Sequence, residues 1–185
     1  MSIFNSIKRL LSLRSRALTN DAPNNGDRLQ PIDHPSLGRL IPEDTDPKTL
    51  LGQIEYATST VELRVFQDDA ELEGVLILAA AAASLIDALD VKCKLLIAKN
   101  KLESYNTNWR FGETRLPNGT AQKFEKPLLS EQQFVANLKL ELLEAIGTDC
   151  LKFWYGDADM FWGHSFYVTS FDGVTMEDVH VSMFG

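Results

Sequence analysis

Residues 70–88 are apolar on nearly every side of a helix, and this stretch constrains the fold more than any other. It contains the run 75–78, Val-Leu-Ile-Leu, followed by five consecutive alanines. Even when this run over 75–83 is extended through Leu89, it meets Ser84 and Asp87 and remains short of the roughly 18 apolar residues typical of a membrane-spanning helix. A helix without a polar face is normally central and buried. We therefore expect the chain to fold around this helix, with the alanines allowing close approach.

Strand patterns precede this helix, at residues 37–41, 51–56 and 60–67, with a turn at 42–48. In the third strand, Val61, Leu63 and Val65 alternate with larger polar or aromatic residues, which gives it one aliphatic face. These segments predict an antiparallel meander.

Acidic residues mark the expected start of the helix. Asp68 and Glu71 have the spacing of a capping box, and Asp69 and Glu73 favour the positive end of a helix. We predict that the helix opens at Asp68.

The pattern becomes amphipathic near Asp90 and predicts either a second helix or a bent continuation of the first. Residues 106–127 then show no helical period and contain Asn118-Gly119, a hairpin-type turn. An irregular segment this long is often functional or mobile. Trp109, Arg110 and Phe111 lie near its start: exposed, they would suit a protein interface, and buried, they would pin the loop.

Ser130 and Gln133 form a second capping box, which predicts a helix over 131–146 that ends at Gly147. Three strands follow at 151–155, 160–169 and 174–183. Grouped strands on both sides of the helices predict an α+β fold. We expect an antiparallel sheet, made of an N-terminal three-strand meander and three C-terminal strands, with two to three helices packed on one face.

The formal charge of −8 is unevenly distributed. Residues 1–16 contain four basic residues and no acid, whereas the rest of the chain holds 14 basic and 26 acidic residues, a net charge of −12. Because phosphate contacts need a clustered positive surface, we expect no nucleic-acid partner. We predict a basic leader and flexible linker over 1–33 and a single domain over 34–185.

The leader has apolar residues at helical spacing among its basic residues, and several interpretations stay open. It could be a surface membrane helix, a partner-docking helix, a mitochondrial-type presequence or a segment without a specific role. Its apolar stretch is too interrupted for a secretory signal. Membrane contact is therefore expected only through residues 1–18, if at all.

The chain has two cysteines, Cys93 and Cys150, both among apolar residues and without the spacing of a metal site. We expect both to be reduced, and the protein to be cytoplasmic.

The closing segment contains the weak candidates for catalysis, His164 with Asp157 and Asp159, since a carboxylate can orient a histidine for general-base work. Asp178 and His180 could extend the set to a metal site. Strand alternation, however, places His164 inside and His180 outside, so we expect no metal and no cofactor.

We expect His164 to be an inner-face histidine with a hydrogen-bonding partner, and the two aspartates to be turn acids. Nucleotide-binding glycine loops and a Gly-x-Ser-x-Gly motif are absent from the sequence. An enzyme therefore has no positive support.

Several motifs resemble an uncharacterised bacterial family of the domain-of-unknown-function type. They are His34-Pro35-Ser36-Leu37-Gly38, Lys99-Asn100, Ser130-Glu131 with Phe134, Phe161-Trp162-Gly163-His164-Ser165, Asp172-Gly173 and Gly185. The resemblance covers about residues 34–185 and leaves the basic leader outside. It implies a fold and a bacterial origin, which weakens the mitochondrial interpretation of the leader, but it implies no activity.

The acidic single domain favours a non-catalytic protein-binding module, such as an immunity protein that neutralises a basic toxin, because opposite charge speeds association. The candidate contact residues are Asp68, Asp69, Glu71, Glu73, Trp109, Arg110, Asp157 and Asp159. Two alternatives remain: an enzyme that uses His164 with Asp157 or Asp159, and a membrane-associated accessory protein held by residues 1–18.

Overall fold

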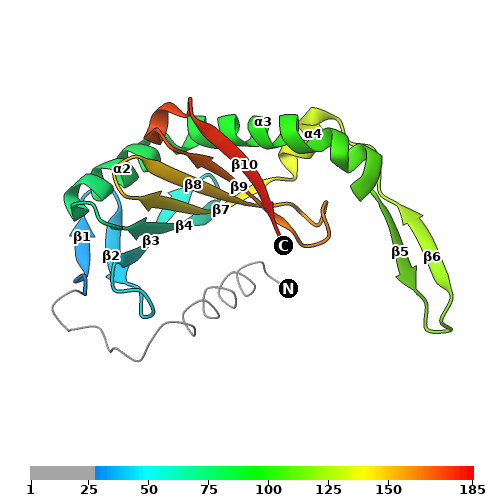
Figure 1. The fold of residues 1–185 in the computed structure, drawn as a ribbon, viewed down its shortest axis with the longest axis horizontal. Coiled ribbons are helices and arrows are strands. Elements are labelled where there is room, and N and C mark those ends of the chain that lie inside the picture. Colours follow the sequence, from blue (N-terminus) through cyan, green and yellow to red (C-terminus); the bar gives the residue numbers. More distant parts are fainter. Residues whose placement is uncertain (1–27) are drawn as a thin grey trace.

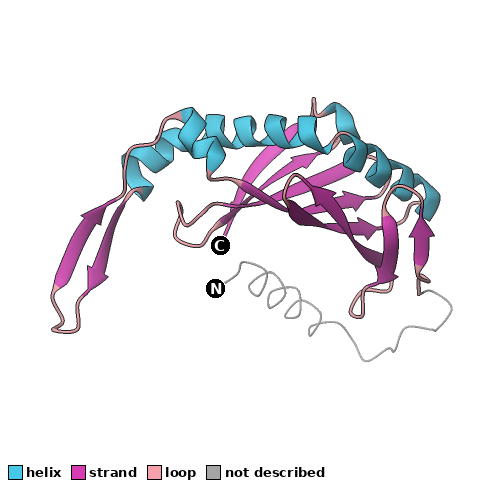
Figure 2. Cartoon of the chain, turned by 180° about the vertical axis from the view of Figure 1, so that it is seen from behind, coloured by secondary structure: helices cyan, strands magenta, loops and turns pink. Residues whose placement is uncertain are grey.

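The structure, a computed structural model, describes residues 28–185. The predicted leader and the linker up to residue 27 lie outside the described residues. One large sheet carries helices on one side, and a separate hairpin extends away from it (Figures 1 and 2). The large sheet has the order β1-β2-β3-β4-β7-β8-β9-β10 and the hairpin pairs β5 with β6.

The strands are β1 (Ile32–His34), β2 (Gly38–Pro42), β3 (Thr49–Tyr56), β4 (Ser59–Phe66), β5 (Phe111–Arg115), β6 (Ala121–Glu125), β7 (Lys139–Ile146), β8 (Cys150–Gly156), β9 (Ser165–Ser170) and β10 (Val179–Phe184). The helices are α2 (Leu72–Ser84), α3 (Ile86–Ser104) and α4 (Glu131–Ala136). Two short turns of helix are η2 (Tyr105–Trp109), which is a π-helix, and η3 (Gly173–Thr175).

The mixed class and the mostly antiparallel sheet are confirmed, but the arrangement of three plus three strands is not. All neighbouring strands of the large sheet are antiparallel except β4 and β7, which run parallel from Glu62 alongside Leu142. Strand β7 joins the two predicted halves into one sheet. Ile32 and Asp33, at the end of the predicted linker, form β1 with His34.

The predicted helix over 131–146 is wrong beyond Ala136. Its capping box is confirmed: the Ser130 hydroxyl accepts the Gln133 amide at 3.3 Å and the Gln133 side chain accepts the Ser130 amide at 2.9 Å. The helix nevertheless stops, and residues 139–146 form the central strand β7. Because this strand is buried on both faces, its apolar residues do not alternate strictly and also fit a helical period.

The predicted helix start at Asp68 is also wrong. Helix α2 begins at Leu72, and Glu71 at its N-cap makes no side-chain capping bond. Asp68 instead lies in a turn at φ +53°. Lys48 holds this turn, because its ammonium donates to the Asp68 carbonyl at 2.9 Å and to the Asp69 carboxylate at 3.2 Å.

Helices α2 and α3 meet at Leu85 with a bend of 80°, so the expectation of a bent continuation is confirmed, although the break lies before Asp90. In the described part of the chain, no single helix is long and apolar enough to span a membrane. Helices α2 and α3 together, continued through η2 to Trp109, have the length and composition of a membrane span, but the 80° bend separates them.

The core lies between these helices and one face of the sheet (Figure 2). Val61, Leu63 and Val65 are fully buried on that face, as their alternation predicts. Val75, Ala79 and Ala82 of α2 are also fully buried, which matches the central helix expected from the sequence.

A buried carboxylate ties α3 to two strands. Asp90 is 2% exposed. It accepts hydrogen bonds from the hydroxyls of Tyr56 at 2.8 Å and Tyr155 at 2.9 Å, and Lys94 pairs with it at 2.8 Å. Burial is the main cause that raises the pKa of both tyrosines, and the Asp90 carboxylate adds to it. Burial also raises the pKa of the neighbouring Cys93 thiol to about 12. Both cysteines are free.

The opposite, helix-free face of the sheet is polar and aromatic. Glu144 is 8% exposed and accepts the indole N–H of Trp154 at 2.6 Å. Arg64 pairs with Glu144 at 3.4 Å and with Glu43 at 3.0 Å. The Trp154 ring also contacts that of Tyr167, at 4.7 Å between centroids. Glu144 of β7 therefore lies at the centre of this network on the helix-free face.

Candidate functional site: the hairpin arm and its base

Residues 111–125 form a two-stranded hairpin that projects from the end of α3, away from the sheet; we call it the hairpin arm (Figures 1 and 2). Its strands pair from Phe111 with Glu125 to Arg115 with Ala121. Asn118-Gly119 lies in the turn, where Gly119 takes φ +83°, as the hairpin-type turn predicts. The expectation of irregular chain over 106–127 is therefore wrong, because π-helix η2 and the hairpin arm occupy most of it.

The two faces of the hairpin arm differ in chemistry. In the antiparallel register, Phe111, Glu113 and Arg115 share one face with Glu125, Lys123 and Ala121. The other face consists of Gly112, Thr114, Gln122 and Phe124, none of which is charged. Phe111, Leu116 and Phe124 are respectively 47%, 37% and 37% exposed. The hairpin arm thus offers one charged and one neutral face.

Two basic residues fix the hairpin arm to the body. The Arg110 guanidinium donates to the carbonyls of Asn106 at 2.9 Å and Lys126 at 3.0 Å, and it pairs with the Glu125 carboxylate. The Lys126 ammonium donates to the Asp159 carbonyl and lies 3.6 Å from the carboxylate of that residue. The Lys126 amide also donates to the Arg110 carbonyl at 2.7 Å. Arg110, predicted as a binding residue, therefore has a positioning role here.

Trp162 links the neutral face to the body. Its ring contacts Phe124 at 5.2 Å, Lys126 lies 3.4 Å above its ring centroid, and its indole N–H donates to the Trp109 carbonyl at 3.0 Å. A Cβ at Gly112 would come within 2.9 Å of this ring and 2.4 Å of the Phe124 ring. Because Gly112 has no side chain, the two rings can meet over the strand. Trp162 itself remains 39% exposed.

The sequence alone does not decide whether Trp109 is exposed or buried. It is half-buried and packs against Phe161 at 5.2 Å and His164 at 5.0 Å. Its neighbour Phe111 is exposed. The aromatic cluster is therefore pinned to the core at Trp109 and open to solvent at Phe111, Phe124 and Trp162; we call Arg110, Lys126, Trp109 and Trp162 the arm base.

Asp157 shapes the turn that presents Trp162. It is 2% exposed, and its carboxylate accepts the amides of Asp159 at 3.0 Å and Phe161 at 2.6 Å. Burial raises its pKa, although these two amide bonds oppose that rise. Trp162 takes φ +59°, a left-handed conformation that is uncommon for a bulky residue. The interpretation of Asp157 as a turn acid is confirmed, and Asp159 is placed next to Lys126.

His164 lies in the turn before β9, not inside a strand that starts at Met160, because β9 begins only at Ser165. It is half-buried, and its Nδ1 bonds to the Phe161 carbonyl. A carbonyl can only accept, so Nδ1 is the protonated nitrogen. The expected hydrogen-bonding partner is thus present, on the backbone. His180 is exposed on β10, as predicted.

Among residues 28–185, no three histidine, cysteine or acidic side chains are gathered in a way that could hold a metal ion. His164 contacts a tryptophan ring and a carbonyl, while both carboxylate oxygens of Asp157 accept backbone amides. The contacts of His164 and Asp157 therefore stabilise the turn between β8 and β9.

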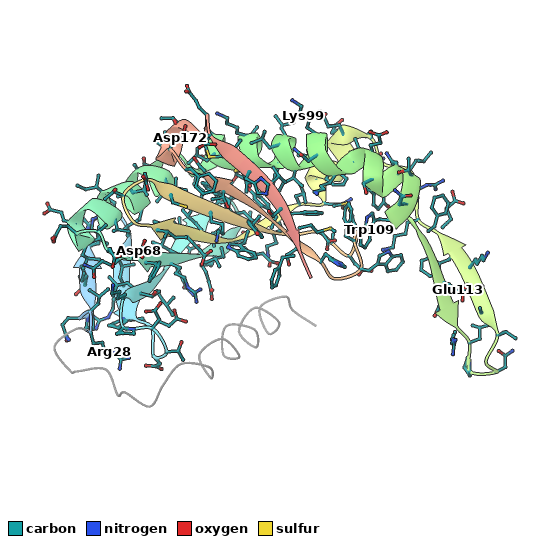
Figure 3. All side chains as sticks on the ribbon, viewed as in Figure 1. Arg28, Asp68, Lys99, Trp109, Glu113 and Asp172 are labelled. Carbon is teal, nitrogen blue, oxygen red and sulfur yellow. The ribbon has the colours of Figure 1, made fainter. Side chains whose placement is uncertain are left out.

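The predicted binding residues fall into two separate groups. Asp68, Asp69, Glu71 and Glu73 lie at the start of α2, where all four are exposed. Trp109, Arg110, Asp157 and Asp159 lie at the opposite end, by the hairpin arm, and Figure 3 shows the two ends through its labels on Asp68 and Trp109. The structure therefore does not bring the acidic group and the aromatic group together.

Sequence reasoning missed Gly112, Phe124, Lys126 and Trp162 as parts of one site. The alternation around the Asn118-Gly119 turn, Phe-Gly-Glu-Thr-Arg before it and Ala-Gln-Lys-Phe-Glu after it, is the pattern that could have identified both strands. Nothing local indicates that Trp162, almost 40 positions further along the sequence, packs onto them.

A family model described as "Uncharacterized protein conserved in bacteria (DUF2262)" matches residues 34–180. No curated protein and no solved structure matches the chain.

Proposed function

This chain belongs to the DUF2262 family of bacterial proteins, and we propose that it is a non-catalytic protein-binding module whose recognition element is the hairpin arm. The single observation that supports this most strongly is that, among the described strands, β5 and β6 pair only with each other and project from the body. An isolated two-stranded hairpin is at best marginally stable in water. A partner that packs on it would supply the missing contacts.

The contacts of the arm base also support a role of the hairpin arm in binding. Arg110 is 13% exposed in its side chain and bonds to two carbonyls, so the hairpin arm leaves the body in a fixed direction. A pre-oriented element loses less entropy on binding than a flexible one. The exposed rings of Phe111, Phe124 and Trp162 are the residue types that dominate protein interfaces. Partner contact is therefore expected on the neutral face, on Trp162 and on the Phe111 ring at the base of the charged face.

Site-specific photo-crosslinking in the bacterium that makes the protein tests this proposal. A photoreactive amino acid at Gln122, on the neutral face, should trap one discrete protein. The same probe at Thr60, an exposed strand residue elsewhere, is the matched control. The crosslink at Gln122 should disappear when Phe124 is replaced by alanine. The same products at both positions, or none at Gln122, would contradict the proposal.

A narrower hypothesis is that the partner is a basic toxin and the protein its immunity protein. The net charge of −12 outside residues 1–16 supports it, since an acidic body attracts a basic partner. The affinity of the trapped partner should then fall as salt is raised from 0.05 to about 0.5 M, because screening weakens charge attraction. An affinity that ignores salt would reject the toxin hypothesis and leave the role of the hairpin arm intact.

A further inference from the structure

Strand β10 forms one edge of the large sheet. It pairs with β9 through six consecutive residue pairs, from Val179 with Ser170 to Phe184 with Ser165, without a bulge. It is the last strand in the sheet order, and no described strand lies on its other side. In Figure 1, this red strand crosses in front of α3. Its outer backbone groups are thus available to a further strand.

This edge lacks the features that normally prevent strand addition. Natural edge strands are short, or carry lysine, other charges, proline or a bulge. Strand β10 reads Val-His-Val-Ser-Met-Phe and has none of these. The other edge, β1, has only three residues, contains Asp33 and is flanked by Pro31 and Pro35. Within residues 28–185, the protein therefore protects one edge of its sheet and leaves the other edge unpaired.

We propose that β10 pairs antiparallel with β10 of a second copy, so that the two sheets become one continuous sheet across a two-fold axis. Residues opposite each other in such a pair face the same side of the sheet. Val179, Val181 and Met183 pack toward the helices, while Phe184 contacts Trp154 on the helix-free face. The register must therefore pair like-facing residues.

A register centred on any residue of β10 meets this condition, and we favour the one centred on Val181 for the side chains that it brings together. It places Val181 opposite itself and Val179 opposite Met183 on the helix side. On the other side it places His180 opposite Ser182, so within residues 179–183 apolar residues meet apolar ones and polar residues meet polar ones; Phe184 falls opposite Asp178, which precedes the strand. Centring on Ser182 would instead set His180 against Phe184. The Val181 register brings no like charges face to face, which suits a two-fold symmetric contact.

Charge substitution on the helix-free side of β10 tests the pairing. In the double variant His180→Lys/Ser182→Lys, each lysine would lie opposite a lysine of the second copy. The double variant His180→Glu/Ser182→Glu does the same with acids. Thr60→Lys, on an exposed residue of β4, is the matched control. Sedimentation equilibrium of the full chain gives the mass, and thermal melting verifies that each variant is folded.

The wild type and Thr60→Lys should approach twice the protomer mass of 20.7 kDa at concentrations above about 100 µM. Each double variant alone should dissociate at least tenfold more readily. An equimolar mixture of the two should regain the dimer, because lysine then faces glutamate. A monomeric wild type, or a mixture that does not associate better than its components, would overturn the proposal. The crosslinks from Gln122 are independent of this outcome, so the two proposals fail separately.

Discussion

Among single residues, Asp90 connects helix α3 to two strands of the large sheet. It is almost fully buried and joins Tyr56 of β3, Tyr155 of β8 and Lys94 of α3. The variant Asp90→Asn removes the charge but keeps the shape. We expect it to lower the free energy of unfolding by about 2–3 kcal/mol, because one charged acceptor oxygen and the ion pair with Lys94 are lost. Urea denaturation measures the change.

The control is Asp69→Asn, since the Asp69 side chain is 94% exposed and, among the described residues, pairs only with Lys48 at the surface. Its effect should stay within about 0.5 kcal/mol. Equal effects of the two substitutions would show that Asp90 does not tie α3 to the sheet.

The same cluster predicts how stability depends on alkaline pH. Burial, then the neighbouring Cys93 and Asp90, raises the pKa of Tyr155 well above its ordinary value near 10. An unfolded tyrosine loses its proton near pH 10 while the folded one keeps it, so the folded state binds more protons and stability falls as pH rises. Tyr155→Phe removes this contribution. The free-energy difference between wild type and Tyr155→Phe should therefore narrow by about 1.4 kcal/mol from pH 9 to 11.

Chemical denaturation at several pH values measures this narrowing. Tyr167→Phe is the control, because Tyr167 lies on the helix-free face and has no contact with Asp90 among the described hydrogen bonds. A free-energy difference between the wild type and Tyr155→Phe that stays constant across this pH range would contradict the prediction.

At the scale of elements, the arm base depends on the missing side chain of Gly112. Gly112→Ala should displace the ring of Phe124 or Trp162, because a Cβ would lie 2.4 Å and 2.9 Å from them. We expect a loss of about 1 kcal/mol of stability and a weaker near-ultraviolet circular dichroism signal of the aromatic cluster. Thr114→Ala, two residues along the same face, should change neither measurement. An unchanged spectrum for Gly112→Ala would mean that the rings do not pack as described.

Local chemistry predicted some elements correctly and long-range packing decided the others. The capping box of Ser130 and Gln133 was predictable because both residues lie within one helical turn. The conversion of residues 139–146 to strand was not, since it depends on parallel pairing with β4, about 80 residues earlier. The same contrast applies to Asp68, whose acidic spacing suits a helix start but whose turn is held by distant Lys48.

The candidate site was predictable to a similar extent. Asn118-Gly119 indicated a hairpin, and Trp109 and Arg110 were identified as an aromatic and basic pair. Their functional neighbours Lys126 and Trp162 come from two other segments, joined to them only by the tertiary fold. No sequence pattern could show that the hairpin would project freely rather than pack on the sheet.

At the scale of the whole molecule, the body and the hairpin arm should be energetically separable. A shortened variant, with residues 113–123 replaced by Asn-Gly, would join Gly112 to Phe124, which are paired neighbours, through a tight turn. The arm base keeps its contacts in this variant. We expect its melting temperature to lie within about 2 °C of the wild type, because the residues removed are exposed and outside the core. A large drop would show that the hairpin arm supports the fold.

The affinity of this shortened variant for the protein trapped by crosslinking shows whether the hairpin arm binds the partner. Titration calorimetry with the purified partner should give a dissociation constant at least 100-fold weaker for the shortened variant that also carries Phe124→Ala than for the wild type, equivalent to about 2.7 kcal/mol. A quadruple variant in which Asp68, Asp69, Glu71 and Glu73 become neutral amides should bind within threefold of the wild type at 0.15 M salt. Equal affinity of the shortened variant with Phe124→Ala and the wild type would contradict the account.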